Sequence, residues 1–373
     1  MYFKLLTVLL LIKPLTSQCP CEDEALCQPV SSTPNREVFA FMNGCEKNIW
    51  ETFDWNKLTT LAVSSCFVPE LVCFAHYHNV RVVPFGTLPD EYLLNETLRM
   101  QWIEEKLSLA QEHYLDGFNI DFESEIPRGD PKAAGLTALA AEMTLKFHQA
   151  IPFSQVTIDV AWSPSGIDGR WYDYVGLSNA VDYLFVMAYD EQSQIFDDEC
   201  TALANSGLTK TDAGLLQYME VGIPASKLVL GVPWYGYDYE CIEHENQTCF
   251  IEEVPFRGAN CSDAAGRQIR YSTIVEQMLP NATGGRQWDY QEKSPYFYMM
   301  DQATGKMHQI WYDDPESLRT KFELVEQYGL RGAGMWSAEQ VDYSNTTEGQ
   351  TQRNEMWGAF PSPTGVHYHI LVV

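Results

Sequence analysis

The sequence predicts an α/β fold, a (β/α)8 TIM barrel with a small β-rich insertion between its seventh and eighth strands. Two observations lead to this fold class. Eight short apolar runs alternate with segments of helical periodicity, as in parallel strands joined by crossover helices. Polar and aromatic residues follow several of these runs, where the active face of such a barrel lies. The alternation by itself also allows a doubly wound open sheet.

Each predicted strand is a short run of the apolar character that barrel strands need on both faces. In chain order the runs are 38–41, 60–64, 80–85, 116–123, 156–161, 183–188, 228–233 and 332–336. Apolar residues at helical spacing predict helices at 69–77, 98–113, 131–151, 172–181, 211–221 and 315–328. This repeated order of strand, helix and strand indicates a parallel sheet.

Residues 235–312 are too many for a loop between a strand and a helix. They are rich in Tyr, Gly and Asn, and they contain alternating runs at 296–300 and 307–312. We expect a small β-rich insertion that covers one side of the active face. No low-complexity linker separates it, so we expect one barrel domain over 18–373 rather than two domains.

The composition limits the class of partner. The chain has 373 residues, 45% of them hydrophobic, which is enough for one large core. Its formal net charge of −27 opposes binding to nucleic acid and to anionic membranes, because both carry negative charge as well. A neutral polymer such as a glycan suits this charge better, and we expect a monomer.

Residues 1–17 have the features of a secretory signal peptide. A lysine precedes the apolar run 5–12, and small polar residues follow; the run is too short to cross a bilayer. Five glycosylation sequons agree with secretion and predict exposed positions at Asn95, Asn246, Asn260, Asn281 and Asn345.

The ten cysteines all follow this leader, so we expect disulfides. Cys66 and Cys73 are close enough in sequence to pair, as is Cys241 with Cys249 or Cys261, but spacing leaves the connectivity open. Zinc is a weaker alternative, because no paired C-x-x-C spacing is present.

The stretch 115–123, LDGFNIDFE, is the most informative part of the chain. As a strand it would place Gly117, Asn119, Asp121 and Glu123 on one face, and Phe118, Ile120 and Phe122 on the other. Strand propensity does not favour such a polar row. A carboxylate two residues away helps to keep a catalytic carboxyl protonated, so the row suits a proton donor. An amphipathic strand with one wet face is the alternative.

Aromatic residues stand at the predicted strand ends. Trp162, Tyr189, Trp234, Tyr235 and Trp336 each follow or end a strand-like run. Because sugars have apolar faces and hydroxyl rims, an aromatic floor with a few hydrogen-bonding groups is the expected lining of a sugar site. Trp162 and Trp234 could equally be core residues.

Asp116-Gly-Phe-Asn119-Ile-Asp121-Phe-Glu123 resembles the D-G-x-D-x-D-x-E signature of glycoside hydrolase family 18, which includes chitinases, chitobiases and endo-N-acetylglucosaminidases. Asn119 stands where most members carry an Asp. Met187-Ala-Tyr189-Asp190 is similar to the family's M-x-Y-D, and Gly334-Met335-Trp336 is similar to its last strand.

The resemblance implies roles for these residues. The catalytic set would be Glu123 as proton donor, with Asp121 and Tyr189 holding the acetamido group of the substrate. The substrate-binding set would be Asn119, Met187, Asp190 and Trp336. The implied mechanism is substrate-assisted with retention of configuration, and it needs no metal and no cofactor.

The resemblance also implies a substrate. The third strand ends in Pro-Phe-Gly without the S-x-G-G of many chitinases, and no chitin-binding module is present. These departures, with Asn119, favour a lysosomal glycosidase that cuts the GlcNAc-β1,4-GlcNAc core of N-glycans and releases the reducing-end sugar. A secreted, extracellular chitinase acting on chitin-type oligosaccharides is the alternative, and a lectin without catalysis is less favoured because Glu123 and Asp121 are both present.

Asn119 carries no charge that could share a proton with Asp121. We therefore expect Asp121 to stay anionic to lower pH than in a chain with Asp at position 119.

Overall fold

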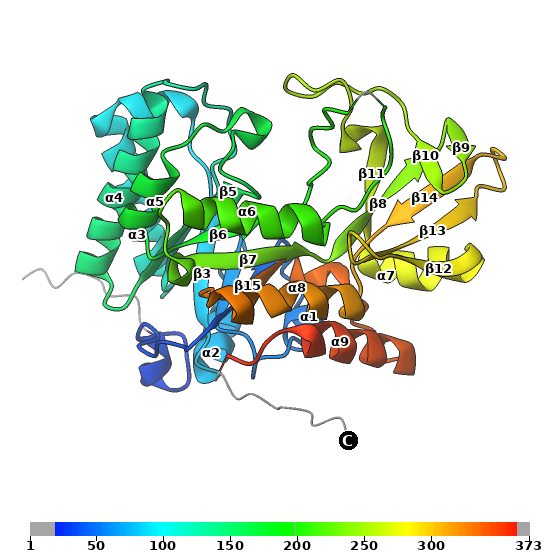
Figure 1. Cartoon of the computed structure of the whole chain (residues 1–373). Coiled ribbons are helices and arrows are strands. Elements are labelled where there is room, and N and C mark those ends of the chain that lie inside the picture. The colour runs from blue at the N-terminus through cyan, green and yellow to red at the C-terminus, as the bar shows by residue number, and fades with distance from the viewer. Residues whose placement is uncertain (1–18, 198, 364–373) are drawn as a thin grey trace, which may run out of the picture.

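Eight parallel strands close into a barrel in the computed structural model, which describes residues 19–197 and 199–363 (Figure 1). The predicted leader at 1–17 lies outside these residues. The strands are β1 (Glu37–Met42), β2 (Thr60–Val63), β3 (Arg81–Gly86), β4 (Gly117–Ile120), β5 (Gln155–Ala161), β6 (Tyr183–Met187), β7 (Leu228–Pro233) and β15 (Gly332–Trp336). Because β1 pairs with both β2 and β15, the sheet has no open edge and the doubly wound alternative is excluded.

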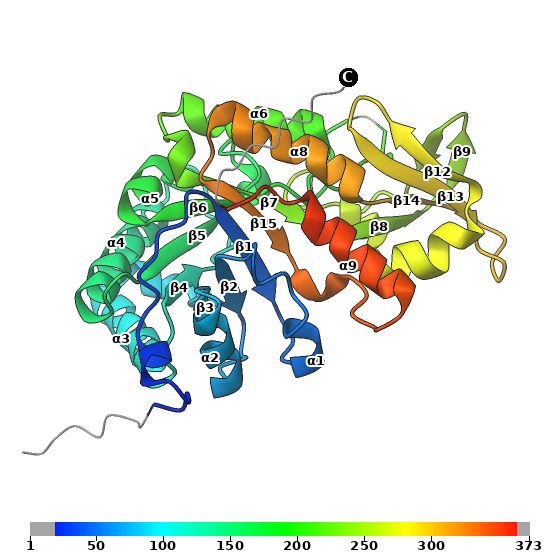
Figure 2. The same cartoon turned by 90° about the horizontal axis from the view of Figure 1, so that it is seen from below.

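Helices surround this barrel, as the view from below shows (Figure 2). They are α1 (Lys47–Trp50), α2 (Pro69–Tyr77), α3 (Glu96–Glu112), α4 (Lys132–Ala150), α5 (Tyr174–Ala180), α6 (Leu208–Glu220), α8 (Pro315–Tyr328) and α9 (Thr347–Ala359). The predicted (β/α)8 barrel is confirmed, and four predicted elements, α2, α8, β7 and β15, have the observed bounds. Helix α9 was not predicted. No helix among the described residues has the length and apolar character needed to cross a membrane.

The insertion between β7 and α8 is β-rich, as predicted, and stands at one side of the barrel (Figure 1). Its five-stranded antiparallel sheet has the order β11-β8-β14-β13-β12. Between β8 and β11 the chain forms a separate two-stranded hairpin of β9 and β10. The strands are β8 (Tyr235–Glu240), β9 (Glu243–Glu245), β10 (Thr248–Phe250), β11 (Gly266–Arg270), β12 (Thr283–Asp289), β13 (Ser294–Met300) and β14 (Met307–Trp311), and the short helix α7 (Tyr271–Thr273) follows β11.

Aromatic rings fill the interior of the barrel. The Phe185 ring lies 5.4 Å from the Phe39 ring and 5.0 Å from the Phe41 ring, measured between centroids. Two glycines make room for it: a Cβ would lie 2.3 Å from Phe185 at Gly231 and 2.5 Å from Phe185 at Gly334. The interior is therefore a packed core, and a ligand can enter only at its ends.

Five disulfides join all ten cysteines, so zinc ligation by their thiolates has no free sulfur to use. The pairs are Cys19–Cys27, Cys21–Cys73, Cys45–Cys66, Cys200–Cys261 and Cys241–Cys249. The candidate pair Cys241–Cys249 is confirmed. The candidate pair Cys66–Cys73 is wrong, because Cys73 on α2 bonds to the N-terminal segment instead. The five sequon asparagines are all exposed, as expected.

His76 on α2 ties the N-terminal segment to the barrel. Its Nδ1 lies 2.7 Å from the Leu26 carbonyl oxygen and its Nε2 lies 2.9 Å from Asp116 Oδ2. Asp116 also accepts hydrogen bonds from the Val30 and Val82 N–H groups. Burial lowers the pKa of His76, but the hydrogen bond and charge of Asp116 outweigh burial and raise this pKa above its ordinary value of 6.5.

This raised pKa makes the contribution of His76 to stability dependent on pH. The contribution is present in full below pH 6.5, which is the pKa of the side chain in the unfolded protein. It is lost as the pH rises through the higher pKa that His76 has in the folded protein. We predict that His76→Gln lowers Tm more at about pH 5 than at about pH 8.

The matched control is His78→Gln, because burial lowers the pKa of His78 and its contribution has the opposite sign. Thermal melts of the two variants and the wild type at both pH values are the measurement. An equal Tm difference for His76→Gln at both values would contradict the prediction.

Candidate active site

A pocket opens at the carboxyl ends of the barrel strands. Six of the residues predicted from sequence line it together, namely Asp121, Glu123, Met187, Tyr189, Asp190 and Trp336. They come from the ends of β4, β6 and β15, which are far apart in sequence. Gln268, on strand β11 of the insertion, also lines the pocket, so the insertion borders the site as predicted.

The polar row begins with Asn119 on β4 and continues beyond the strand as the acidic row, Asp121 and Glu123. The predicted strand 116–123 is longer than the observed one, because β4 ends at Ile120. The Asp121 N–H still donates to the Gly86 carbonyl of β3 at 2.9 Å, which holds Asp121 at the barrel mouth. The predicted alternation is observed: Phe118 and Phe122 are buried on the helix side, while Glu123 is exposed.

Asn119 lies below the pocket and is fully buried. Its Nδ2 donates to Thr157 Oγ1 and to Asp159 Oδ1 of β5, both at 2.9 Å. Unlike the other residues of the predicted substrate-binding set, Asn119 does not line the pocket and contacts Asp159 in the barrel interior.

Three carboxyl groups, those of Asp159, Asp121 and Glu123, line the same side of the pocket. Burial, followed by the charge and hydrogen bond of Glu123, raises the pKa of Asp121 to about 7. Burial, followed by the charge of Asp121, raises the pKa of Asp159 well above its ordinary range. Burial and Glu123 therefore raise the pKa of Asp121 without an Asp at position 119, and the expected difference from a chain with Asp at that position stays a prediction.

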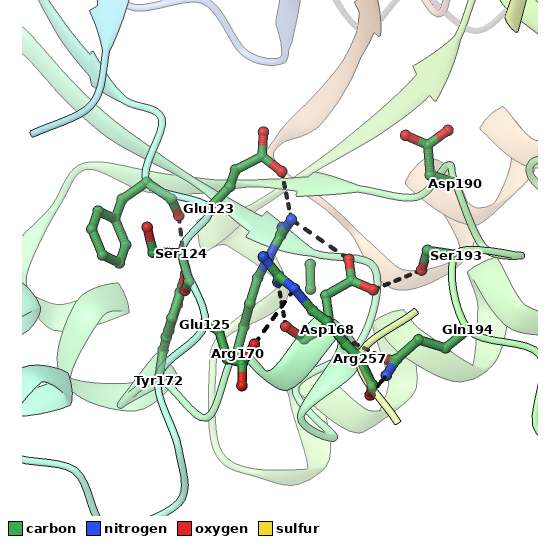
Figure 3. Close-up of polar contacts among 12 residues, drawn as sticks. Glu123, Ser124, Glu125, Asp168, Arg170, Tyr172, Asp190, Ser193, Gln194 and Arg257 are labelled. Carbon is green, nitrogen blue, oxygen red and sulfur yellow. Dashed lines mark hydrogen bonds and ion pairs between the residues drawn. The ribbon is translucent and has the colours of Figure 1, made fainter. Parts of the chain in front are cut away.

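Arg170 is the cation next to this row. Its Nη2 donates to Glu123 Oε2 at 2.5 Å and lies 3.5 Å from Asp168 Oδ2 (Figure 3). The Arg170 side chain is only 10% exposed, whereas that of Glu123 is 49% exposed. Glu123 therefore lies between a carboxyl group and a guanidinium group.

Asp190 is held by the insertion. The hydroxyl groups of Tyr235 and Tyr237 on β8 donate to Asp190 Oδ1 at 2.6 and 3.1 Å. The Asp190 backbone has a φ of 50°, unusual for a residue other than glycine, and its N–H donates to Asn205 Oδ1 at 2.8 Å. Burial raises the pKa of Asp190 to about 6, although the two tyrosine hydroxyls oppose this shift.

Trp336 lies on the aromatic core of the barrel. Its ring centroid is 5.2 Å from that of Phe41 and 5.9 Å from that of Phe85. Trp162 also lines the pocket. Trp234 does not: it is fully buried and packs against Trp357 of α9 at 5.2 Å, so Trp234 is a core residue. An indole over a packed aromatic base offers a flat, rigid surface for a sugar face.

Several lining residues were not predicted from sequence, namely Asp159, Ile167, Asp168, Arg170 and Gln268. Asp159 had a usable signal, because it is a single carboxyl within the apolar run 156–161. Arg170 and Asp168 had none, because they lie in a loop whose path depends on contacts with other loops.

A comparison with known protein families identifies the family of this chain. The family model of glycosyl hydrolases family 18 matches residues 86–340, a span that includes the acidic row, Tyr189 and the C-terminal strand.

The chain belongs to glycosyl hydrolases family 18.

This family 18 glycoside hydrolase has close relatives. It is 46% identical over 358 residues to the di-N-acetylchitobiase of Mus musculus, covering 96% of each chain. It is 45% identical over 342 residues to the di-N-acetylchitobiase of Homo sapiens, covering 91% of this chain and 88% of the relative. The family resemblance inferred from the motifs is therefore confirmed.

Solved structures share the fold of this chain. The C-terminal domain of a putative chitinase from Desulfitobacterium hafniense superposes with a TM-score of 0.69 at 22% identity, covering 86% of this chain and 99% of that one. A mutant class V chitinase from Nicotiana tobaccum, solved in complex with NAG4, gives a TM-score of 0.67 at 17% identity, covering 89% of this chain and 100% of that one.

The buried pair of Asn119 and Asp159 generates a stability prediction. Asn119→Asp would place a second carboxyl against Asp159 inside the barrel, where two carboxyl groups cannot both ionise easily. We predict that Asn119→Asp lowers Tm, and lowers it more at about pH 7 than at about pH 5.

The matched control is the double variant that combines Asn119→Asp with Asp159→Asn. It again places one amide and one carboxyl group in contact. Thermal melts should show recovery of most of the lost Tm in the exchanged variant. If Asn119→Asp leaves Tm unchanged, the two side chains do not form the contact that the structure shows.

Proposed function

We propose that this enzyme hydrolyses the GlcNAc-β1,4-GlcNAc core of N-linked oligosaccharides by a substrate-assisted mechanism with retention of configuration. The observation that carries this proposal is the arrangement of Asp121, Glu123 and Tyr189 around one pocket above Trp336. The di-N-acetylchitobiase names of the two relatives support the choice of substrate.

In the first step the acetamido oxygen of the substrate attacks its own anomeric carbon. Glu123 gives its proton to the glycosidic oxygen, and the bond between that oxygen and the anomeric carbon breaks. Asp121 and Tyr189 hold the acetamido group in line and stabilise the oxazolinium ion as it forms. The tyrosine is neutral throughout, because burial raises the pKa of Tyr189 well above its ordinary value.

In the second step water attacks the anomeric carbon, and the Glu123 carboxylate accepts its proton. The oxazolinium ring opens, the acetamido group is restored, and the product keeps the configuration of the substrate. Trp336 and Met187 form the apolar lining of the sugar site, and Asp190 forms part of its polar lining. The chemistry uses side chains and the substrate's own nucleophile.

The loops beside Glu123 support release of one reducing-end sugar. We place the leaving sugar beside Glu123, where Arg170 and its partner Asp168 also line the pocket. Behind this wall, Ser193 Oγ donates to Asp168 Oδ1 at 2.8 Å, and Arg257 of the insertion donates to the Asp168 carbonyl. Because these hydrogen bonds hold Asp168 in place, we infer that the pocket favours a short leaving group over a long chitin chain.

We further propose that the protein acts as a monomer in the lysosome after removal of residues 1–17 in the secretory pathway. Five disulfides, five exposed sequons and the acid-stabilised His76 contact support this route.

Replacement of the proton donor tests the mechanism. We predict that Glu123→Gln lowers kcat by at least about 10² to 10⁴-fold, because the amide cannot donate the proton. Binding of GlcNAc oligomers, measured by calorimetry, should change little. Activity close to that of the wild type would remove Glu123 from this role.

Product analysis tests the substrate assignment. With GlcNAc oligomers labelled at the reducing end, we predict release of labelled monomer, as expected if Asp168 and Arg170 close the pocket beyond one leaving sugar. Release of dimers from the chain interior would indicate a chitinase instead. A β1,4-linked glucose disaccharide is the matched control, since it lacks the acetamido nucleophile and should not be cleaved.

A further inference from the structure

Arg170 contacts the proposed proton donor directly, although no motif pointed to it. Its Nη2 donates to Glu123 Oε2 at 2.5 Å, and its side chain is nearly buried while that of Glu123 is half exposed. Such a charge-assisted contact is stronger than a neutral hydrogen bond and fixes the orientation of the carboxyl group. A guanidinium group stays charged over the whole pH range in which glycosidases work.

The position of Arg170 is fixed by its own loop. Its N–H donates to the Ile167 carbonyl at 3.0 Å, and its carbonyl accepts from the Tyr174 hydroxyl at 2.7 Å. Asp168, the second partner of the guanidinium, has a φ of 54° and accepts the Ser193 hydroxyl at 2.8 Å, while its N–H donates to Gln194 Oε1 at 2.7 Å. Arg170 is therefore placed before any substrate binds.

The loop that carries Glu123 is joined to the loop that carries Arg170. The Ile126 N–H donates to the Gly169 carbonyl at 3.1 Å, and the Trp171 N–H donates to the Ile126 carbonyl at 3.0 Å. The Tyr172 hydroxyl donates to the Ser124 carbonyl at 2.6 Å (Figure 3). The acid and its cation consequently belong to one rigid unit.

Other titratable groups surround this contact. They are Asp121 after β4, Asp159 on β5, Asp168 and Tyr172 in the Arg170 loop, Tyr189 and Asp190 after β6, Glu125 beyond Glu123, and Arg257 of the insertion. Carboxyl groups predominate. Burial and Glu123 raise the pKa of Asp121 to about 7, and the charge of Arg170 opposes them.

We propose that Arg170 is the positioning residue of the proton donor: its guanidinium holds the Glu123 carboxyl toward the leaving oxygen and stabilises the carboxylate that proton donation creates. This role rests on the proposed function, in which Glu123 is the acid. When Glu123 gives its proton to the glycosidic oxygen, the negative charge left on its carboxylate lies against Arg170. The same carboxylate then accepts a proton from water, and Arg170 remains unchanged throughout.

Arg170→Gln tests this role, with two substrates. On GlcNAc oligomers, whose sugar leaving group needs its proton, kcat should fall by about tenfold or more with little change in KM. On 4-nitrophenyl β-chitobioside, whose leaving group needs little protonation, the loss should be much smaller. The pH profile should move up, because Arg170→Gln removes the charge that opposes the rise in the pKa of Asp121.

Two further variants serve as controls. Arg170→Lys keeps the charge and should restore the limbs of the profile, although it lacks the planar fork of Arg. Arg128→Gln removes an exposed arginine that stacks on Trp171 at 4.4 Å without contacting Glu123, and should leave both substrates and the profile unchanged.

The outcomes separate the two proposals. Equal losses on both substrates with unmoved limbs, in Arg170→Gln and in Arg170→Lys, would show a structural role and overturn the inference. Unchanged kinetics in Arg170→Gln would overturn it as well. A wild-type enzyme that cleaves neither substrate would instead overturn the proposed function, and the role of Arg170 with it.

Discussion

The main constraint on this molecule is the row of carboxyl groups that rises from inside the barrel to its mouth. Asp159 lies deepest, beside the amide of Asn119, and Glu123 lies at the surface against Arg170. The parallel register of β4 and β5, which pairs Asn119 with Thr157, places that amide beside Asp159. The amide at the buried end and the guanidinium at the exposed end stabilise carboxyl groups that would otherwise repel one another.

The insertion contributes to the site as well as covering it. Two tyrosines of β8 fix Asp190, and Gln268 of β11 donates to one of them, Tyr237, at 3.0 Å. The Cys200–Cys261 disulfide joins the loop after β6 to the insertion. The barrel thus supplies the acids and the aromatic base, and the insertion fixes the orientation of the polar groups opposite them.

Local signals explain what could be predicted from the sequence. Helix α8 has the predicted bounds because Asp314 caps it, Pro315 starts it and Gly329 ends it, and all three signals lie within the segment itself. Helix α9 was missed because its buried face includes Arg353 and Gln352, whose hydrogen bonds to the Asp342 segment replace apolar contacts. Its periodicity is therefore weak.

What could not be predicted depends on contacts between distant segments. The motif located Asp121 and Glu123, but the proton on Asp121 depends on burial that only the closed barrel provides. Arg170 reaches Glu123 across 47 positions of sequence, and no local pattern marks that pairing. The Cys21–Cys73 disulfide likewise follows from how α2 packs against the N-terminal segment, which spacing cannot show.

The pairing of β1 with β15 has a consequence for biosynthesis. Glu37 lies opposite Gly332, so one edge of the first strand stays unpaired until almost the whole chain has left the ribosome. During that time the backbone of β1 can bond to other extended segments. The Cys21–Cys73 disulfide encloses β1 and its neighbour β2 between its cysteines, and it can form while the nascent chain is still short. Disulfide formation in the lumen of the secretory pathway can thus restrain β1 before its partner strand β15 has been synthesised.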